Sequence, residues 1–213
     1  MKNTDNNNCN ENLIDISMEI SPNMPVYKGR KSKKPIFKNL SNHKNDNIHE
    51  TEITINLHTG THVDAPLHMI ENGKDSEIFD FFITDCKVLD LTKVKNCITH
   101  NHLQRFNINH NDFILLKTKN SHNKGTQNFI YLRKDGAEYL VSKKIKGTGI
   151  DSLGIERNQP GHPTHRKLLG ENIIIIEGLN LKNVKAGSYK LFFIPLNIKE
   201  VEALPVKILL KQI

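Results

Sequence analysis

The stretch HTGTHVDAPLH, residues 58–68, gathers three histidines and an aspartate within eleven residues. Gly60 and Pro66 both oppose a helix, so we expect this segment to be a loop that leaves the end of a strand, where functional side chains often converge. Two neutral imidazoles and one carboxylate form a ligand set that suits a borderline divalent cation such as zinc. Gly60 would let the backbone turn tightly between His58 and His62. The stretch therefore predicts a metal site.

The spacing of two histidines alone would be weak support for that site. The chain contains 11 histidines, and a single histidine is usually a hydrogen-bonded core or surface residue rather than a ligand. The segment before the stretch, Glu50–Leu57, alternates polar and apolar residues, which is the period of a half-buried strand. The metal interpretation depends on the whole string and on its position after that strand.

Outside this region, short apolar runs alternate with amphipathic segments. Helices are expected before Phe113 with Thr99 as a cap, over 133–144, and near 162–169, where Pro163 stands in the first turn and Gly170 just past the end. Strands are expected at 13–20, 87–91, 113–116, 145–150, 173–176, 192–194 and 206–213. Strands that alternate with helices, with extra hairpin-like strands near the front, predict one α/β domain with a mixed β-sheet and flanking helices.

The length of 213 residues fits a single domain that can bury a sizeable core. Residues 1–11 are polar and rich in asparagine, and we interpret them as a disordered leader to a domain that spans 12–213. Residues 28–47 are lysine-rich and predict an exposed loop or edge hairpin that could border a pocket.

The composition argues against several classes of partner. Lysine and arginine total 30 against 23 aspartate and glutamate, but the lysines are scattered and lack interleaved aromatics, so we expect a solvated surface and no nucleic-acid ligand. No run approaches the roughly 20 apolar residues that a membrane span requires, so no membrane association is expected. Three cysteines without ligand spacing predict a reducing, cytoplasmic location.

Four segments together resemble one known family. The string HxGTHxDxPxH at 58–68 is matched at every fixed position, and it is accompanied by LIDISMEISPNMPVY at 13–27, KKIKGTGIDSLGIE at 143–156 and HRKLLGENIIIIEGLNL at 165–181. These motifs are similar to those of the cyclase or kynurenine formamidase (arylformamidase) family of metal-dependent hydrolases. The resemblance covers most of the chain and implies a swivelling β/β/α-like fold.

The resemblance also implies a ligand set and a proton-transfer residue. Its metal ligands would be His58, His62, Asp64, His165 and Glu177, with Asp64 able to bridge to a second cation. Family members hold one or two ions, so we expect one or two Zn²⁺, with Mn²⁺ as an alternative. His162 is a nearby alternative to His165. His68 would be a histidine that is not a ligand and that donates and accepts a proton.

The implied reaction is hydrolysis of a small amide by metal-bound hydroxide, with conversion of N-formylkynurenine to kynurenine and formate as the best single expectation. The chain has no GxSxG motif, which argues against a serine hydrolase. Two alternatives stay open: opening of a cyclic amide, as in isatin hydrolase, and a metal-binding member without activity. Because family members are commonly dimers, a homodimer is expected.

The sequence departs from the family pattern around the substrate. Tyr27 stands where relatives carry an aromatic residue, often tryptophan, that packs on the substrate ring; it is either a substrate contact or a core or rim aromatic. Lys28–Arg30 replaces a Pro-Gly-Asp turn of many relatives, and Gly154 replaces a more usual serine. Ser152 is expected to fix the backbone beside the site.

Overall fold

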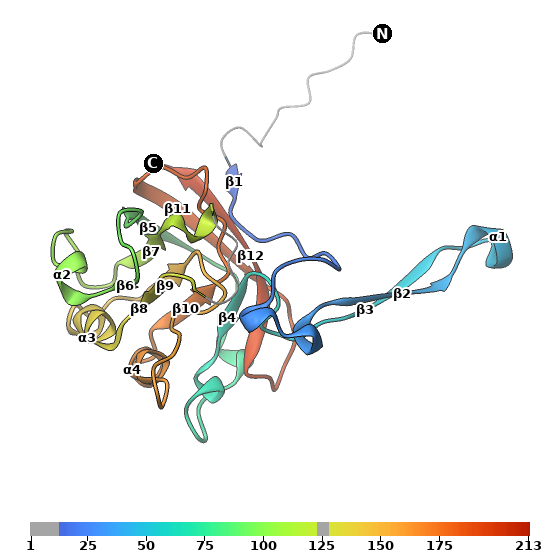
Figure 1. The fold of residues 1–213 in the computed structure, drawn as a ribbon, viewed down its shortest axis with the longest axis horizontal. Helices are drawn as coiled ribbons and strands as arrows, with labels where there is room; N and C mark the ends of the chain where they lie inside the picture. The colour runs from blue at the N-terminus through green and yellow to red at the C-terminus, as the bar shows by residue number, and fades with distance from the viewer. Residues whose placement is uncertain (1–12, 123–127) are drawn as a thin grey trace, which may run out of the picture.

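Strand β12 (Ala203–Gln212) closes the main sheet of the computed structural model, which describes residues 13–122 and 128–213. One edge of β12 pairs with β11, and the other edge pairs with both β1 and β4. Seven strands thus form a closed, mixed barrel in the order β12-β11-β5-β7-β9-β10-β4, with β1 beside β12 (Figure 1). Their bounds are β1 Leu13–Asp15, β4 His62–Asp64, β5 Phe82–Asp90, β7 Phe113–Lys117, β9 Gly147–Ile150, β10 Ile174–Glu177 and β11 Gly187–Pro195.

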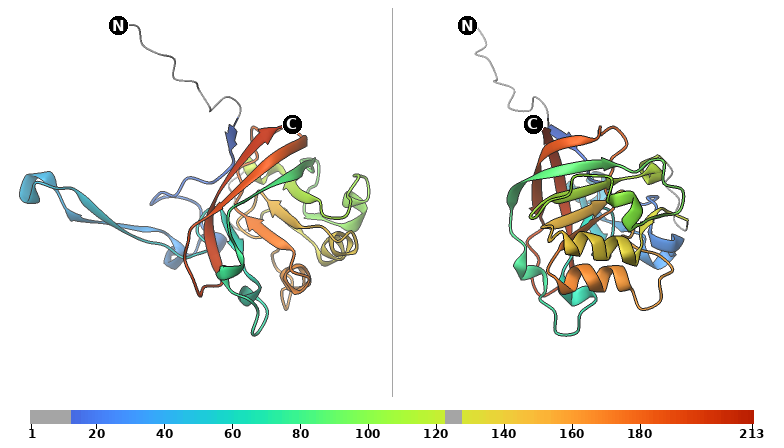
Figure 2. Two further views of the ribbon diagram at one scale, coloured as in Figure 1. Left: turned by 180° about the vertical axis from the view of Figure 1, so that it is seen from behind. Right: turned by 90° about the vertical axis from the view of Figure 1, so that its left-hand side faces the viewer.

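The predicted mixed α/β domain is confirmed in this closed form, with fewer helices than a sheet with flanking helices implies. Strands β5, β7, β9 and β10 are parallel neighbours, whereas the other pairs in the barrel are antiparallel. The α-helices α2 (His100–Leu103), α3 (Lys134–Ser142) and α4 (Pro163–Gly170) lie outside the parallel strands on one side of the barrel (Figure 2). Thr99 is the N-cap residue of α2, as predicted.

Alternate side chains of the barrel strands enter two separate apolar cores. Phe113 and Leu115 of β7 lie in the cluster inside the barrel, whereas Ile114 and Leu116 lie in the cluster beneath the helices. This double burial explains why β7 is a continuous apolar run rather than an alternating one. The barrel interior is packed so tightly that a Cβ atom on Gly147 would lie 2.3 Å from Cε2 of Phe113.

Residues 36–54 form a two-stranded arm that projects away from the barrel (Figure 1). The arm consists of β2 (Ile36–Ser41), the short helix α1 (His43–Asp46) and β3 (Glu50–Thr54). The exposed loop or edge hairpin predicted at 28–47 is confirmed in part: the first strand and the tip lie in this range, but the second strand, β3, lies beyond it. The half-buried strand predicted at Glu50–Leu57 is wrong in its burial, because every residue of β3 is exposed. Its alternating pattern belongs to a ribbon with solvent on both faces.

The remaining elements are short. A second two-stranded sheet joins β6 (Cys97–Ile98) to β8 (Tyr131–Leu132). The strand expected at 13–20 ends at Asp15, and the expected leader at 1–11 lies outside the described residues. Within the described ranges, no helix is long and apolar enough to cross a membrane. Turns of 3-10 helix occur at Tyr27–Gly29, Lys31–Lys33, Pro66–His68, Ser76–Ile78 and Lys119–Ser121.

Candidate metal centre

The segment that contains His62 and Asp64 is a strand of the barrel, not the loop that the sequence suggested. Gly60 and Pro66 do exclude a helix, but they flank the three-residue strand β4. Residues two apart on a strand share a face, so His62 and Asp64 project together while Val63 packs inside the barrel. The strand therefore aims both side chains toward the side of the barrel where α4 lies.

Strand pairing brings the distant Glu177 to the same place. Glu177 ends β10 and is the register partner of His62 on the antiparallel strand β4. Its Oε2 atom lies 3.3 Å from His62 Nε2. Ile176 enters the barrel core, so the alternation of β10 turns Glu177 outward onto the face that carries His62 and Asp64.

Helix α4 packs against this face and contributes His165. His165 Nε2 lies 3.1 Å from Glu177 Oε1 and 3.6 Å from Asp64 Oδ2. The alternative histidine, His162, is the N-cap residue of α4, and its side chain is 55% exposed. Its nearest charged contact is Glu156 at 3.8 Å. The structure thus places His165, and not His162, against Asp64 and Glu177.

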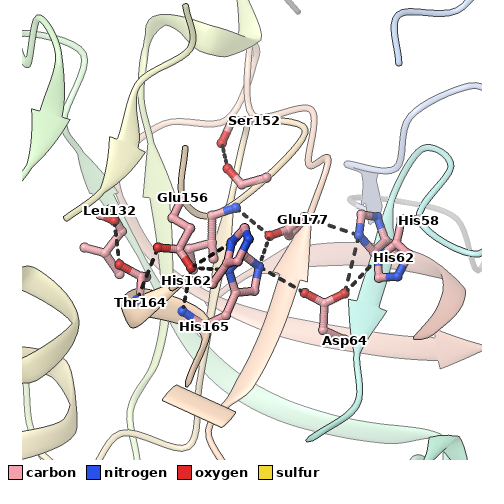
Figure 3. Close-up of polar contacts among 12 residues, drawn as sticks. His58, His62, Asp64, Leu132, Ser152, Glu156, His162, Thr164, His165 and Glu177 are labelled. Atoms are coloured by element: carbon pink, nitrogen blue, oxygen red, sulfur yellow. Dashed lines mark hydrogen bonds and ion pairs between the residues drawn. The ribbon is translucent and has the colours of Figure 1, made fainter. Parts of the chain in front are cut away.

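The two other predicted histidines, His58 and His68, complete the cluster, and Figure 3 shows His58 beside Asp64. His58 Nδ1 lies 3.1 Å from Asp64 Oδ1. His68 ends a 3-10 turn after β4, with its ring centroid 4.3 Å from that of His58 and 5.7 Å from that of His165. All five predicted ligands and His68 are therefore brought together.

In each of the three candidate histidine ligands, the ring nitrogen that faces away from the cluster contacts an oxygen atom outside it. His62 Nδ1 lies 3.0 Å from Gly60 O, His58 Nε2 lies 3.4 Å from Glu202 Oε1, and His165 Nδ1 lies 2.6 Å from Glu156 Oε1. This pattern is typical of metal-binding histidines, whose outer nitrogen donates a hydrogen bond that fixes the ring. Sequence reasoning assigned no role to Glu156 or Glu202, although Glu156 ends one of the four segments that carry the family resemblance.

Opposite charges control the pKa values of this buried cluster. Burial alone lowers the pKa of His165, but contacts with Asp64, Glu156 and Glu177 outweigh burial and raise the pKa well above its usual value. For Asp64, burial favours the neutral acid, yet His165 and His58 hold the pKa well below its usual value. Burial likewise opposes ionisation of Glu177, whose neighbouring histidines lower its pKa to about 2. The contacts between imidazoles and carboxylates therefore oppose the cost of burying this cluster.

The donor set fits a divalent cation. His62 Nε2 and both carboxylate oxygens of Asp64 are buried and lack a well-directed hydrogen bond within the described part of the chain. Orphaned buried polar atoms are costly unless something binds them. Asp64 belongs to two groups of close donor atoms, one with His58 and His68 and one with His62 and Glu177. A cation held by these nitrogen and oxygen atoms would satisfy them.

Tyr27 borders the cluster from a separate segment. Burial raises the pKa of its hydroxyl, and the negative charge of Glu177 raises it further. Its ring centroid lies 6.0 Å from that of Phe129. A Cβ atom on Gly154 would lie 3.0 Å from the Tyr27 ring, so the departure from serine at Gly154 leaves room for this tyrosine. Ser152 Oγ donates to Gly154 O at 2.7 Å and so fixes the same turn.

A cavity of about 800 Å³ lies near this turn but includes none of the candidate ligands. Its lining includes Asp151, Ser152 and Phe129. The Asp151 carboxylate accepts hydrogen bonds from the hydroxyls of Thr118 and Ser121 at 2.7 and 2.8 Å. Because the segment after β7 already satisfies Asp151, the chemistry of the site belongs to the His/Asp/Glu cluster instead.

Comparison with known proteins identifies the family. Residues 14–157 match the family model described as "Putative cyclase". The chain belongs to the cyclase family. Among relatives of this cyclase chain, a kynurenine formamidase of Salinibacter ruber is 27% identical over 93% of this chain and 97% of its own length. Cyclase-like protein 2 of Arabidopsis thaliana is 30% identical over 94% of this chain and 79% of its own length.

Solved structures of cyclase-like proteins have the same fold. One described as a "Potential Metal-Dependent Hydrolase With Cyclase Activity" superimposes with a TM-score of 0.86 at 42% identity, over 93% of this chain and 96% of its own. Isatin hydrolase A of Labrenzia aggregata superimposes with a TM-score of 0.77 at 21% identity, over 94% and 93% of the two chains. The second likeness concerns the fold alone.

Proposed function

We propose that this cyclase-family chain is a metal-dependent hydrolase, with His58, His62, Asp64, His165 and Glu177 as the metal ligands. The observation that carries the proposal is the convergence of these five side chains, with each histidine held on its outer nitrogen by a separate oxygen. The name of the 42% identical structure supports the same class of activity.

Zinc is the proposed ion, because imidazole and carboxylate ligands suit it, and Mn²⁺ is the alternative. When bound, the cation supplies a water molecule of lowered pKa and polarises the substrate carbonyl. The two carboxylate oxygens of Asp64 face different proposed ligands, Oδ1 facing His58 and Oδ2 facing His165. This position supports Asp64 as the bridging ligand where two ions are held.

His68 is the proposed proton-transfer residue. Burial lowers the pKa of its imidazole, so the ring is neutral near pH 7 and can accept a proton. The ring lies beside His58 and His165 but does not take part in their contacts with Asp64. In amide hydrolysis, His68 would accept a proton from the attacking water and pass it to the leaving nitrogen.

The proposed substrate is a small aryl amide, with N-formylkynurenine first. The Tyr27 ring packs on Gly154, next to the Ile155 N–H that donates to Glu177, and its other neighbour is the ring of Phe129; aromatic rings pack well against an aryl substrate. Tyr27 is proposed as the substrate contact. The relative named kynurenine formamidase, 27% identical, supports a formamide as the bond that is cleaved.

The test begins with the protein as isolated, whose metal content is measured by mass spectrometry and whose formate release is assayed with N-formylkynurenine. The double variant His58→Ala, Asp64→Ala should lose both the metal and turnover. The matched control is His162→Ala, which removes an exposed histidine outside the cluster and should keep both. Full activity in the double variant would overturn the mechanism.

The same assay separates the two alternatives. Opening of isatin without formate release would identify a cyclic-amide hydrolase. Metal binding with neither activity would identify a family member that binds metal without catalysis.

We further propose that the chain is a cytoplasmic homodimer. The arm is a two-stranded ribbon, which is marginally stable alone in water, and it exposes Ile36, Ile48 and Ile53 by 62%, 55% and 53%. A second copy would cover these side chains. Light scattering should give twice the chain mass, and Ile36→Ser, Ile53→Ser should shift the protein toward monomer; a monomeric wild type would contradict the dimer.

The proposed cytoplasmic location has its own test. Thiol labelling of the native protein should find Cys97 reduced, as it is in the structure.

A further inference from the structure

Glu156 is a buried carboxylate that lies between β9 and α4 and contacts His165 twice. One oxygen, Oε1, accepts from the His165 backbone N–H at 3.0 Å and lies 2.6 Å from the His165 ring Nδ1. The other oxygen, Oε2, accepts from Thr164 N at 3.2 Å and from Gln159 Nε2 at 2.7 Å. Glu156 is 2% exposed, so water does not compete for these bonds.

We propose that Glu156 is the positioning residue that fixes the ring of His165 and aims its Nε2 atom at the metal. The contacts determine the tautomer. An ionised carboxylate accepts and cannot donate, so the ring nitrogen that faces Oε1 must carry the hydrogen. In the neutral ring, Nε2 then keeps its lone pair, and this is the nitrogen that faces Glu177 and Asp64.

The same oxygen fixes both the backbone and the ring of His165. The N-cap residue of α4, His162, gives no side-chain cap to the helix, and the free N–H groups of Thr164 and His165 turn to Glu156 instead. Glu156 therefore sets the position of the first helical turn and, through Oε1, the rotation of the imidazole that this turn carries. A metal ligand held at two points loses little freedom when the ion binds.

A glutamine cannot replace Glu156 in this role. All four partners are donors, two on each oxygen. Whichever way the amide of a glutamine is turned, its NH₂ group meets N–H donors. By contrast, Glu202 makes a single contact with His58 at 3.4 Å, and the Glu202 side chain is 38% exposed. Glu202 therefore holds its histidine less firmly than Glu156 does.

The test rests on the proposed metal site and measures zinc affinity by competition with a chelator, together with the visible spectrum of the Co²⁺-loaded protein. Glu156→Gln should bind zinc about 10–100-fold more weakly and change the Co²⁺ spectrum. If that variant does not fold, Glu156→Asp, which keeps the charge on a shorter side chain, should show a weaker affinity in a folded protein.

The matched control is Gln159→Ala. It removes a donor to Oε2 and weakens the start of α4, but it leaves the bonds from Oε1 to His165. Its melting temperature should fall while its zinc affinity and Co²⁺ spectrum stay those of the wild type. Equal losses of affinity in Gln159→Ala and Glu156→Gln would mean that only the helix start matters and would overturn the proposal.

Ion binding by the wild type distinguishes an error in the proposed metal site from an error in the role of Glu156. If the wild type binds neither zinc nor Co²⁺, the proposed function is wrong. If the wild type binds both ions and a folded Glu156→Gln or Glu156→Asp binds them equally well, the metal site stands and the positioning role of Glu156 is wrong.

Discussion

His62 and Glu177 face each other across the paired strands β4 and β10, with Nε2 and Oε2 3.3 Å apart. Both side chains are almost fully buried, and the two residues come from distant parts of the sequence. The contact exists because β4 pairs with β10, and the other edge of β4 pairs with β12 and so closes the barrel. The strand that closes the barrel therefore also supplies His62 and Asp64 to the candidate metal centre.

The first prediction concerns Glu177→Gln, which keeps the size of the side chain and removes its charge. Zinc affinity should fall by about tenfold or more, because a neutral amide is a poorer ligand than a carboxylate. A tenfold loss of affinity lowers the stabilisation by saturating zinc by about 1.4 kcal/mol. Thermal melting with and without zinc measures this difference. Glu171→Gln, an exposed substitution past α4, should retain the full zinc-induced shift; equal shifts in both variants would contradict the role of Glu177.

The second prediction is that metal binding releases protons. Carboxylate contacts outweigh the effect of burial and raise the pKa of His62 and His165 above the usual value, so in the metal-free protein both rings hold the extra proton to a higher pH than a free imidazole does. Zinc can bind only the deprotonated rings. The apparent affinity should therefore rise with pH, by about tenfold per unit for each proton released.

Calorimetry in buffers of different ionisation enthalpy counts these protons. The same raised pKa values stabilise the metal-free fold below the unfolded histidine pKa of 6.5, and this stabilisation is lost as pH rises through the folded pKa. An affinity independent of pH between 6 and 8 would show that the rings are already neutral.

The convergence of candidate ligands could be predicted from the sequence because His58, His62 and Asp64 stand close together in a pattern that neither a helix nor a core requires. The spacing of His165 and Glu177, twelve residues apart, followed from the resemblance. The position of Glu156 could not be predicted, because a carboxylate that orients a histidine has the same local sequence signal as a surface carboxylate. Its role appears only when the loop after β9 is placed beside α4.

The strands were predicted with less accuracy where the pairing is non-local. The alternation of polar and apolar residues in Glu50–Thr54 is the same for a half-buried strand and for a ribbon exposed to solvent on both faces. Burial could therefore not be inferred from this alternation alone. For His62–Asp64, Gly60 and Pro66 excluded a helix but could not distinguish a loop from a short strand. That choice is made by β10 and β12, which pair with β4 from distant parts of the chain.

The third prediction separates proton transfer from metal binding. His68→Gln should lower kcat by about 10²–10⁴-fold, the usual contribution of a general acid–base group, and should leave the zinc content unchanged. His110→Gln, at an exposed position, is the matched control and should keep wild-type kcat. Loss of zinc in His68→Gln would instead make His68 a ligand.

The final prediction tests the packing that supports the centre from inside the barrel. In Gly147→Ala, the new Cβ atom would lie 2.3 Å from Phe113 Cε2, so the ring or the strand must move. Overpacking of this kind costs about 1–3 kcal/mol, which corresponds to a fall in Tm of about 2–4 °C per kcal/mol for a chain of this size. Gly170→Ala is the control, because nothing lies within 4 Å of its Cβ position at the end of α4; its stability should be unchanged or slightly higher. Adding Phe113→Leu to Gly147→Ala should recover part of the loss, since the two residues share one space. If Gly147→Ala melts with the wild type, the barrel interior is looser than this contact implies.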